Sequence, residues 1–554
     1  MTPVTAGIYP GSAREDAEAM ARGTATTAQI ARARAALGLT NEQVAVLNSG
    51  GEITLTPDQA TYLREFLGSQ KSASLEDLRT FGDALAPELK GAAKGILADA
   101  LQVGTNPGVV GPGFQGGLTQ SPDSVRELLK RNLAKELPGD TEPYKRINQF
   151  KALVDVLERG DGRLRAGTDI DRGLLKQAAE LRGVGGSTWD PDVVSDMLKI
   201  GGDDRPAVHS FLTGAGMEAT LGDGEKFEKD HYLDHLFEHR WRDDSGFRSL
   251  LDNIGQDAKA DNLEVRTMSG QDSRVLTQYM LDHKEQLMSL GQRDGGVVDS
   301  LGNALAPFIP SMAGVPDEIS GAAGFLPLSS GDDMETVFAI IDGNETAAIH
   351  FNAAAAAQIG QLNQLYATGI VHGEDDPALA TWAGRIDHAM STGMNAQIEH
   401  QFEDASDRHS YKAKVYSGFV NATGGVLAAA PGGPVTYPAL MVAAPFAQDM
   451  VIGGAPSLDQ FGASEQDIIT ANHAGSENRR YYDVFEELVK ADKIDPAHPD
   501  YASLFRDGKL IPYEELAHSG DAATTLTQMS GKVMQLTPSE FEQAWDNGHN
   551  SNWK

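Results

Sequence analysis

Helix-start signals recur along this chain and restrict it to a largely helical fold. Four of them join a capping side chain to a proline: Thr56-Pro57, Ser121-Pro122, Asp190-Pro191 and Thr537-Pro538. The capping oxygen accepts a backbone N–H of the first turn, and proline is harmless at the first helical position because its missing N–H would have no partner there. Gln59 and Glu540 complete two capping boxes. Apolar residues at helical spacing follow these signals.

Strand patterns are few by comparison. The chief candidates are Glu52–Leu55 and Leu263–Thr267. A parallel-sheet fold needs a regular alternation of strands and helices, which this sequence lacks. The sequence therefore predicts a mostly α, multi-subdomain helical protein with Gly/Pro-rich linkers and at most a few short strands.

Charged residues thin out, and glycine and proline gather, at two places that we interpret as linkers. We expect an N-terminal helical subdomain at 1–103, a linker at 104–119, a central helical subdomain at 120–300, a second linker at 301–330 and a C-terminal helical region at 331–554. The first linker contains Gly111–Gly116, which matches G-x-G-x-x-G. A dinucleotide site needs a strand before this motif and a helix directly after it, so we assign the motif to the linker.

The chain is strongly acidic and contains no cysteine. Its 79 Asp and Glu against 46 Lys and Arg give a net charge of −33, which disfavours nucleic acid and anionic lipid and favours a basic partner. The absence of cysteine excludes thiol catalysis, zinc thiolate sites and disulfides. The first residues lack a basic segment followed by an apolar one, so we expect no Sec signal peptide.

An uncharged run extends from Val415 to Gln448. Four prolines interrupt it, so no stretch reaches the length of a spanning helix, and its two apolar arms predict a hairpin at about 415–448. A buried core hairpin is our interpretation. A membrane-active hairpin is the alternative.

One pattern offers metal chemistry. His235, Glu238 and His239 spell H-x-x-E-H, in which two histidines one helical turn apart can hold zinc and the glutamate can activate a water. Leu233, Leu236, Phe237 and Trp241 form the apolar face of the same helix, which predicts that the histidines face solvent. We favour a solvated helix and expect no metal or other cofactor; a zinc-dependent hydrolase is the enzymatic alternative.

Four segments of the chain carry a family resemblance. They are Val337–Ile359, which predicts two helices broken at Asp342–Asn344, Leu305–Gly314, Leu39–Leu67 and His239–Phe247. Together they resemble actinobacterial, largely mycobacterial, proteins described as carrying a "TPR repeat region". The resemblance implies an association with type VII secretion or with leaders of large secreted toxins. The sequence itself shows no 34-residue repeat with the Trp, Leu-Gly and Tyr pattern.

Two short motifs bear on export. Trp382 and Gly384 form a W-x-G triplet, and Tyr482 and Glu486 form Y-x-x-x-E, but about two matches of the second kind arise by chance in so acidic a chain. Our leading hypothesis is a non-enzymatic, secretion-associated helical protein that acts through contacts with a protein partner, such as secretion machinery or a chaperone. We expect it to be secreted or at the cell surface by a route without a Sec signal; a cytoplasmic location is the alternative.

Overall fold

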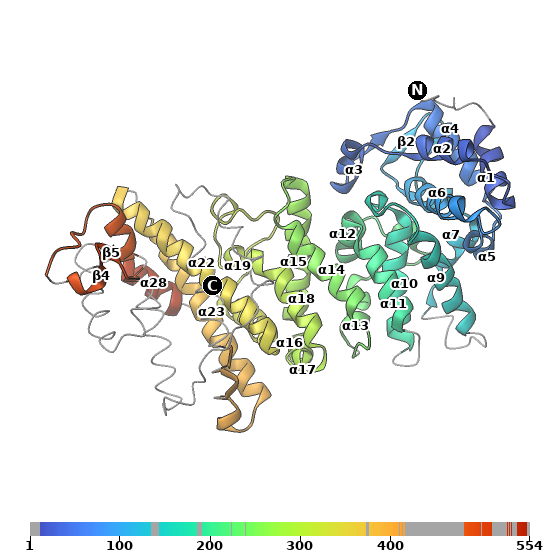
Figure 1. Cartoon of the computed structure of the whole chain (residues 1–554). Helices are drawn as coiled ribbons and strands as arrows, with labels where there is room; N and C mark the ends of the chain where they lie inside the picture. The colour runs from blue at the N-terminus through green and yellow to red at the C-terminus, as the bar shows by residue number, and fades with distance from the viewer. Residues whose placement is uncertain are drawn as a thin grey trace. The chain divides into compact units, whose positions relative to one another are not determined.

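The computed structural model describes residues 11–133, 143–185, 191–415, 481–511 and 540–550, apart from 223, 239, 373–375, 409, 413, 483 and 500, and also describes 529, 531 and 533. The chain divides into two compact units, Met1–Tyr279 and Met280–Lys554 (Figure 1). Both are built from helices with a few short strands, so the mostly α fold is confirmed.

The first unit is a packed set of helices. They are α1 (Ser12–Arg22), α2 (Thr27–Leu37), α3 (Asn41–Asn48), α4 (Pro57–Ser69), α5 (Leu75–Arg79), α6 (Pro87–Thr105), α7 (Asp123–Lys130), α9 (Pro143–Leu157), α10 (Asp169–Gly185), α11 (Pro191–Gly202), α12 (Arg205–Thr213), α13 (Lys229–Phe237), α14 (Ser245–Asp257) and α15 (Leu263–Asp282). The predicted start of α4 is confirmed: Thr56 caps Pro57, and Gln59 completes the capping box. The Asp190 and Thr537 caps lie outside the described residues.

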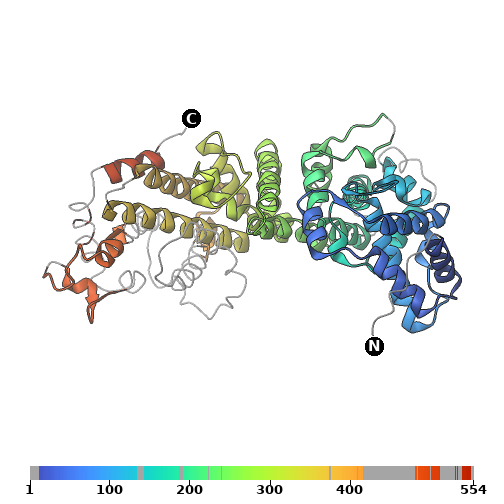
Figure 2. The same cartoon turned by 90° about the horizontal axis from the view of Figure 1, so that it is seen from above.

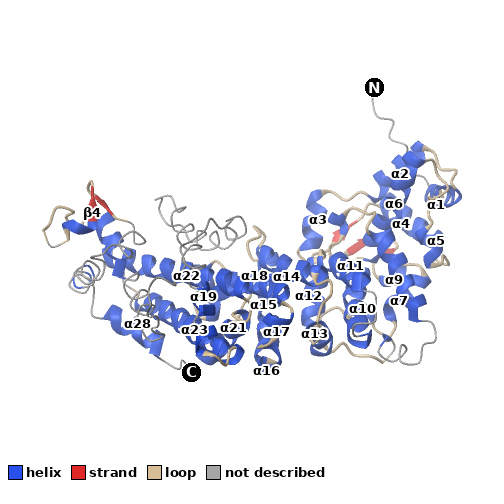
Figure 3. Cartoon of the chain, turned by 60° about the horizontal axis from the view of Figure 1, so that its bottom comes forward, coloured by secondary structure: helices blue, strands red, loops and turns tan. Residues whose placement is uncertain are grey.

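A small sheet accompanies these helices (Figure 3). β1 (Ile53–Thr54) pairs in parallel with β2 (Val109–Gly111), which pairs antiparallel with β3 (Phe114–Gln115). The first predicted strand is therefore confirmed, and the G-x-G-x-x-G segment forms the β2–β3 hairpin. Its turn is Pro112-Gly113, and Gly113 has the positive φ of 66° that the third residue of a Pro-Gly turn requires.

The second predicted strand, Leu263–Thr267, is wrong. These residues are the first turns of α15. The Asn262 side-chain oxygen accepts the N–H groups of Glu264 and Val265, which satisfies two donors that a helix start leaves free. The helix cap outweighs the strand preference of the two β-branched residues in this segment, Val265 and Thr267.

The second unit begins with short helices and continues into two long ones. They are α16 (Lys284–Leu287), α17 (Leu290–Arg293), α18 (Gly295–Leu305), α19 (Ile309–Met312), α20 (Asp317–Ser320), α21 (Gly331–Ile341), α22 (Glu345–His372), α23 (Pro377–Gln401) and α28 (Glu540–Asn550). α22 and α23, drawn in yellow to gold, lie side by side (Figures 1 and 2). α23 also packs against α21 and α28.

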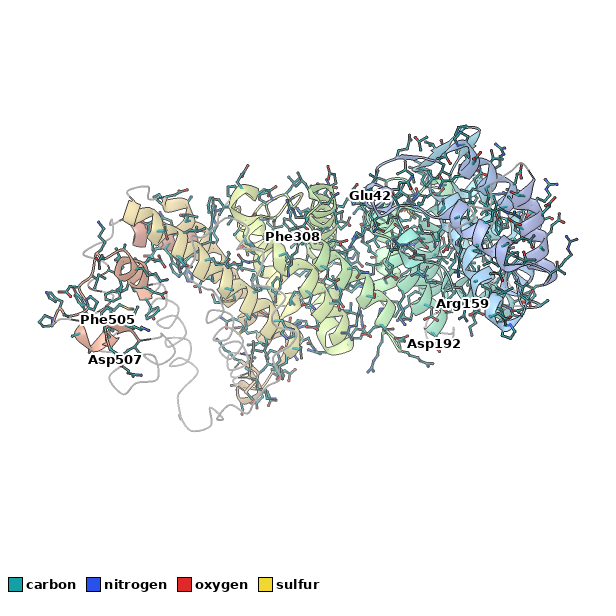
Figure 4. The ribbon with its side chains drawn as sticks, turned by 45° about the horizontal axis from the view of Figure 1, so that its top comes forward. Glu42, Arg159, Asp192, Phe308, Phe505 and Asp507 are labelled. Atoms are coloured by element: carbon teal, nitrogen blue, oxygen red, sulfur yellow. The ribbon has the colours of Figure 1, made fainter. Side chains whose placement is uncertain are left out.

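Residues 301–330, expected to be a linker, contain the end of α18 together with α19 and α20. Phe308, Ile309 and Met312 are fully buried, and the Phe308 ring stacks on Phe325 with centroids 5.4 Å apart (Figure 4). The proline-rich composition therefore belongs here to short packed helices, because proline is accepted in a first helical turn.

The block Val337–Ile359 forms the end of α21 and the first half of α22, and the predicted break at Asp342–Asn344 is confirmed. Asp342 is fully buried and accepts a hydrogen bond of 2.7 Å from the Asn352 side chain. The Tyr411 hydroxyl donates to the Asp342 carbonyl at 2.6 Å. These contacts hold the turn inside the unit.

A hairpin near the C-terminus joins β4 (Phe505–Arg506) to β5 (Lys509–Leu510). Its two-residue turn, Asp507-Gly508, has positive φ at both positions, as hairpin turns that match strand twist require. Phe505 and Asp507 mark the strand and the turn in Figure 4. Residues 416–448 of the predicted apolar hairpin lie outside the described residues. Within the described ranges, the helices are all too short or too polar to cross a bilayer.

Candidate functional site

The H-x-x-E-H helix is α13, and its predicted apolar face is confirmed. Leu233, Leu236 and Phe237 are buried, and Trp241 is nearly so, with its indole N–H donating to the Leu236 carbonyl at 3.0 Å. The Phe237 ring packs on Tyr279 and Phe247. Burial of this apolar face stabilises the packing of α13 on the other helices of the first unit.

The candidate metal ligands of α13 occupy different environments. His235 is half-buried and its ring lies directly over Gly183 of α10, while its centroid is 4.2 Å from that of His231. Glu238 is exposed, and His239 lies outside the described residues. Among the residues that the structure describes, no three His, Asp or Glu side chains lie close enough together to hold a metal ion. Packing against Gly183 gives His235 a structural role that helical spacing did not predict.

The two candidate export motifs lie on helices. Trp382 and Gly384 are inside α23, and Gly384 touches the backbone of α28. Tyr482 is buried and its hydroxyl donates to the Ile511 carbonyl at 2.9 Å. Glu486, one turn later, pairs with Lys490 at 3.3 Å. Packing and ion pairing thus account for three of these four residues, Gly384, Tyr482 and Glu486.

The centre of the first unit is α10, and its charged side chains are a feature that the sequence analysis missed. Buried polar residues run along the whole helix: Asp169, Asp171, Arg172, Lys176, Gln177, Glu180 and Arg182. α10 packs against α7, α11, α12 and α13, so no face of it is left for solvent. Buried charges are costly unless they are paired and hydrogen-bonded, and here most of them are.

At the start of α10, two buried carboxylates accept hydrogen bonds from the loop at Leu118, from the loop before α10 and from the start of α12. Asp169 pairs with Arg172 at 2.8 Å and accepts the Leu118 N–H at 2.8 Å. Asp204, which caps α12, accepts the backbone N–H groups of Gly167, Thr168 and Ala207 at 2.6–3.0 Å. The loop before α10 is thereby tied to the start of α12.

Asp171 is the exception to this pairing. It is fully buried and accepts a hydrogen bond from the Gln102 amide at 3.3 Å, while its Oδ2 has no hydrogen-bond partner among the residues that the structure describes. Burial, together with the nearby Asp204 carboxylate, raises the pKa of Asp171 well above its ordinary value.

In the middle of α10, long side chains satisfy the end of α7. Lys176 Nζ donates to the Arg131 carbonyl at 2.8 Å and to the Thr220 carbonyl at 3.3 Å, and it lies 3.4 Å from Glu180. Gln177 donates to the Leu129 and Arg131 carbonyls at 2.8 Å. Glu180 accepts the Leu133 N–H at 2.6 Å. Helix ends leave carbonyls without partners, and α10 supplies donors to these.

A cavity lies between α12, α14 and α15, and we call it the α12–α15 cavity. Its polar lining includes Arg205, Asn253, Asp257, Ser269 and Asp272. Arg205 pairs with Asp257 across the cavity. The His209 ring, beside the lining, hydrogen-bonds Asp272 at 2.7 Å. Burial opposes the charged imidazole, but the hydrogen bond to Asp272 outweighs it and raises the pKa of His209.

Comparison with known proteins identifies part of the first unit. Residues 35–253 match a TPR repeat domain. The match covers less than half of the chain and extends from the end of α2 to most of α14. No curated protein and no solved structure matches the sequence.

The repeat signature was missed because this TPR repeat domain lacks the aromatic pattern sought. Its helices instead meet at small residues: a Cβ on Gly201 would press against Leu175 at 2.7 Å, and one on Gly173 would touch Leu129 at 3.0 Å. Glycine is common throughout this chain, so a small residue at a helix contact gives no periodic signal. The α12–α15 cavity extends from the end of the TPR repeat domain into α15.

Proposed function

We propose that this chain is a non-enzymatic helical protein that acts through protein–protein contacts of its TPR repeat domain. The family match over residues 35–253 is the observation that carries this proposal. The buried charges of α10 support it, since they hydrogen-bond to three neighbouring parts of the first unit: Lys176 to the segment after α7, Arg172 to Ser210 of α12 and Arg182 to the segment after α13. A rigid helical scaffold loses little conformational entropy when it binds a partner.

The charge distribution favours a basic partner. The second unit has 14 Lys and Arg against 37 Asp and Glu, whereas the first has 32 against 42. Complementary charge accelerates encounter and is screened by salt. Binding that depends on the acidic second unit should therefore weaken as ionic strength rises.

We further propose that these protein–protein contacts serve type VII secretion. It is supported by the resemblance of Val337–Ile359 and three other segments to actinobacterial secretion-associated proteins. In this proposal the chain reaches the cell surface or the medium by the type VII route, in contact with secretion machinery or a chaperone.

Export can be tested with the full chain in an actinobacterial host and in the same host lacking the type VII secretion ATPase. We expect the chain in the culture filtrate of the first strain only, with a cytoplasmic marker absent from both filtrates. Equal amounts in the two filtrates would contradict type VII export. Contact is tested separately by calorimetry of the full chain with purified secretion components, and absence of binding to all of them would contradict the proposed partner class.

A further inference from the structure

Two side chains at the break between α21 and α22 each keep one oxygen without a hydrogen-bond donor. They are Asp342, whose Oδ2 has no partner, and Asn352, whose Oδ1 has none, within the part of the chain that the structure describes. Asp342 is fully buried and Asn352 is 2% exposed, so bulk water does not reach these oxygens. A buried acceptor without a donor is costly, and here two occur on side chains that already contact each other.

The hydrogen bonds of the Asn352 amide fix how the two groups face each other. Its Nδ2 donates to Asp342 Oδ1 and to the Ala348 carbonyl, both at 2.7 Å. Turning the amide over would place its oxygen against the Ala348 carbonyl, which cannot donate. A carboxyl and a carboxamide are both planar and of similar width. When they share one hydrogen bond, an O–H on the second carboxyl oxygen can therefore donate to the amide oxygen.

The charged groups around α21 leave the Asp342 carboxylate without a cation. The titratable and charged groups on the elements that pack against α21, and on the segment after α23, are the pairs His388–Glu335, His350–Asp299, Arg293–Asp294 and Lys414–Glu345, the exposed Lys284 and Glu285 of α16, and Tyr411. Tyr411 donates to the backbone carbonyl of Asp342 and not to its carboxylate. Among the residues described, the carboxylate is hydrogen-bonded to Asn352 alone. Burial therefore raises the pKa of Asp342 well above its ordinary value, and the hydrogen bond from Asn352 opposes this effect.

The same arrangement recurs in the first unit. The Gln102 amide donates to Asp171 Oδ1, while Gln102 Oε1 and Asp171 Oδ2 have no partner in the described ranges. Both side chains are buried. In each unit a fully buried carboxyl shares one hydrogen bond with an amide, and one proton on the carboxyl would supply the second.

We propose that Asp342 and Asn352 form a proton-binding site that makes the stability of the second unit depend on pH. Asp342 carries the proton on Oδ2 and donates it to Asn352 Oδ1, which closes a ring of two hydrogen bonds and satisfies both oxygens. The protonated pair is neutral, as an apolar surrounding requires. When the proton leaves at higher pH, a carboxylate without a cation remains buried and destabilises the break between α21 and α22. This inference concerns folding and does not depend on the proposed function.

The test compares the full chain with Asp342→Asn in urea unfolding between about pH 5 and 9. The variant's amide can make the same two hydrogen bonds with Asn352 and cannot ionise. Above the unfolded pKa of about 4, the folded parent keeps a proton that the unfolded chain has lost. The unfolding equilibrium constant of the parent, relative to that of the variant, should therefore rise about tenfold per pH unit until the folded pKa is passed. A ratio that does not change with pH overturns the proposal.

Infrared spectroscopy reads the proton directly. At about pH 6, where exposed carboxyls are ionised, the spectrum of the parent minus that of Asp342→Asn should contain a carboxylic-acid C=O band, which lies apart from the amide and carboxylate bands. If an ordered water joined the two oxygens in place of a proton, the carboxyl would be ionised and the band would be missing. Absence of the band overturns the proposal.

Asp332→Asn is the matched control, because it removes an exposed carboxylate of the same helix. It should keep the pH dependence of the parent and give no acid band in the difference spectrum; a band or a pH-dependent ratio equal to that of Asp342→Asn overturns the site. Should Asp342→Asn fail to fold, Asn352→Ala decides. Loss of the amide partner should move the acid band of Asp342 to a higher wavenumber, and an unmoved or absent band overturns the pairing.

Discussion

Gly384 of α23 lies so close to Trp545 of α28 that a Cβ atom on this glycine would overlap the Trp545 carbonyl oxygen. The contact is reciprocal, because a Cβ on Gly548 would overlap the Thr381 carbonyl. The Thr381 hydroxyl donates to the Ala544 carbonyl at 3.0 Å, and His549 lies 3.2 Å from Asp387. The two backbones thus touch directly, which explains the glycine of the W-x-G triplet by packing.

Gly384→Ala should therefore destabilise the second unit. Inserting a methyl group into so close a contact costs about 1–3 kcal/mol, more than the gain in helix propensity of about 1 kcal/mol. Gly91→Ala on α6 is the matched control, because a Cβ there meets nothing within 4 Å. Thermal unfolding followed by circular dichroism should show a lower melting temperature for the first variant and an unchanged or higher one for the second. Equal shifts would refute the close contact.

Asp171→Asn should stabilise the chain at neutral pH. The folded-state pKa of Asp171 is raised above its unfolded value of about 4, so the folded state is penalised as pH rises through that value toward the folded pKa. Asparagine cannot ionise. The gain of the variant over the parent should be near zero below about pH 4 and largest above the folded pKa, as measured by denaturant unfolding across pH.

Asp204→Asn provides the contrast. Both oxygens of Asp204 accept backbone N–H groups, from Gly167, Thr168 and Ala207, and an amide can accept at one side only. This variant should lose about 1–3 kcal/mol at neutral pH. A stabilised Asp204→Asn, or an Asp171→Asn without pH-dependent gain, would contradict the assignment of roles to the two carboxylates.

Local sequence signals predicted much of the secondary structure, whereas contacts between residues far apart in the sequence could not be predicted from them. The start of α4 follows from Thr56 and Gln59, three residues apart, and the break at Asp342–Asn344 follows from its turn-forming residues. The partners of Lys176 are the carbonyls of Arg131 and Thr220, 45 and 44 residues away. From sequence, α10 therefore resembles a helix with an exposed charged face. The contact of His235 with Gly183 is hidden for the same reason.

Lys176→Met should be strongly destabilising. It leaves the carbonyls of Arg131 and Thr220 with one donor fewer and leaves Glu180, whose side chain is 2% exposed, without its cation. Removing one member of a buried pair costs about 3–5 kcal/mol. Lys199→Met is the control, since the Lys199–Asp196 pair is exposed and 3.6 Å long. It should cost less than about 1 kcal/mol. Comparable losses in urea unfolding would show that burial of Lys176 does not matter.

The packing of His235 on Gly183 can be measured with a double-mutant cycle. Gly183→Ala should be destabilising by about 1–3 kcal/mol, because its methyl group would occupy the space of the His235 ring. In the His235→Ala background the same methyl group has room, so Gly183→Ala should become neutral or stabilising through its helix propensity. Urea unfolding should therefore show that the double variant is more stable than the sum of the two single losses in free energy predicts. Additive effects would place the His235 ring away from α10 and return it to the solvated face that the sequence indicated.

The parent should bind no stoichiometric zinc in elemental analysis, since the His235 ring packs against Gly183. One tightly bound zinc per chain would contradict this role for His235.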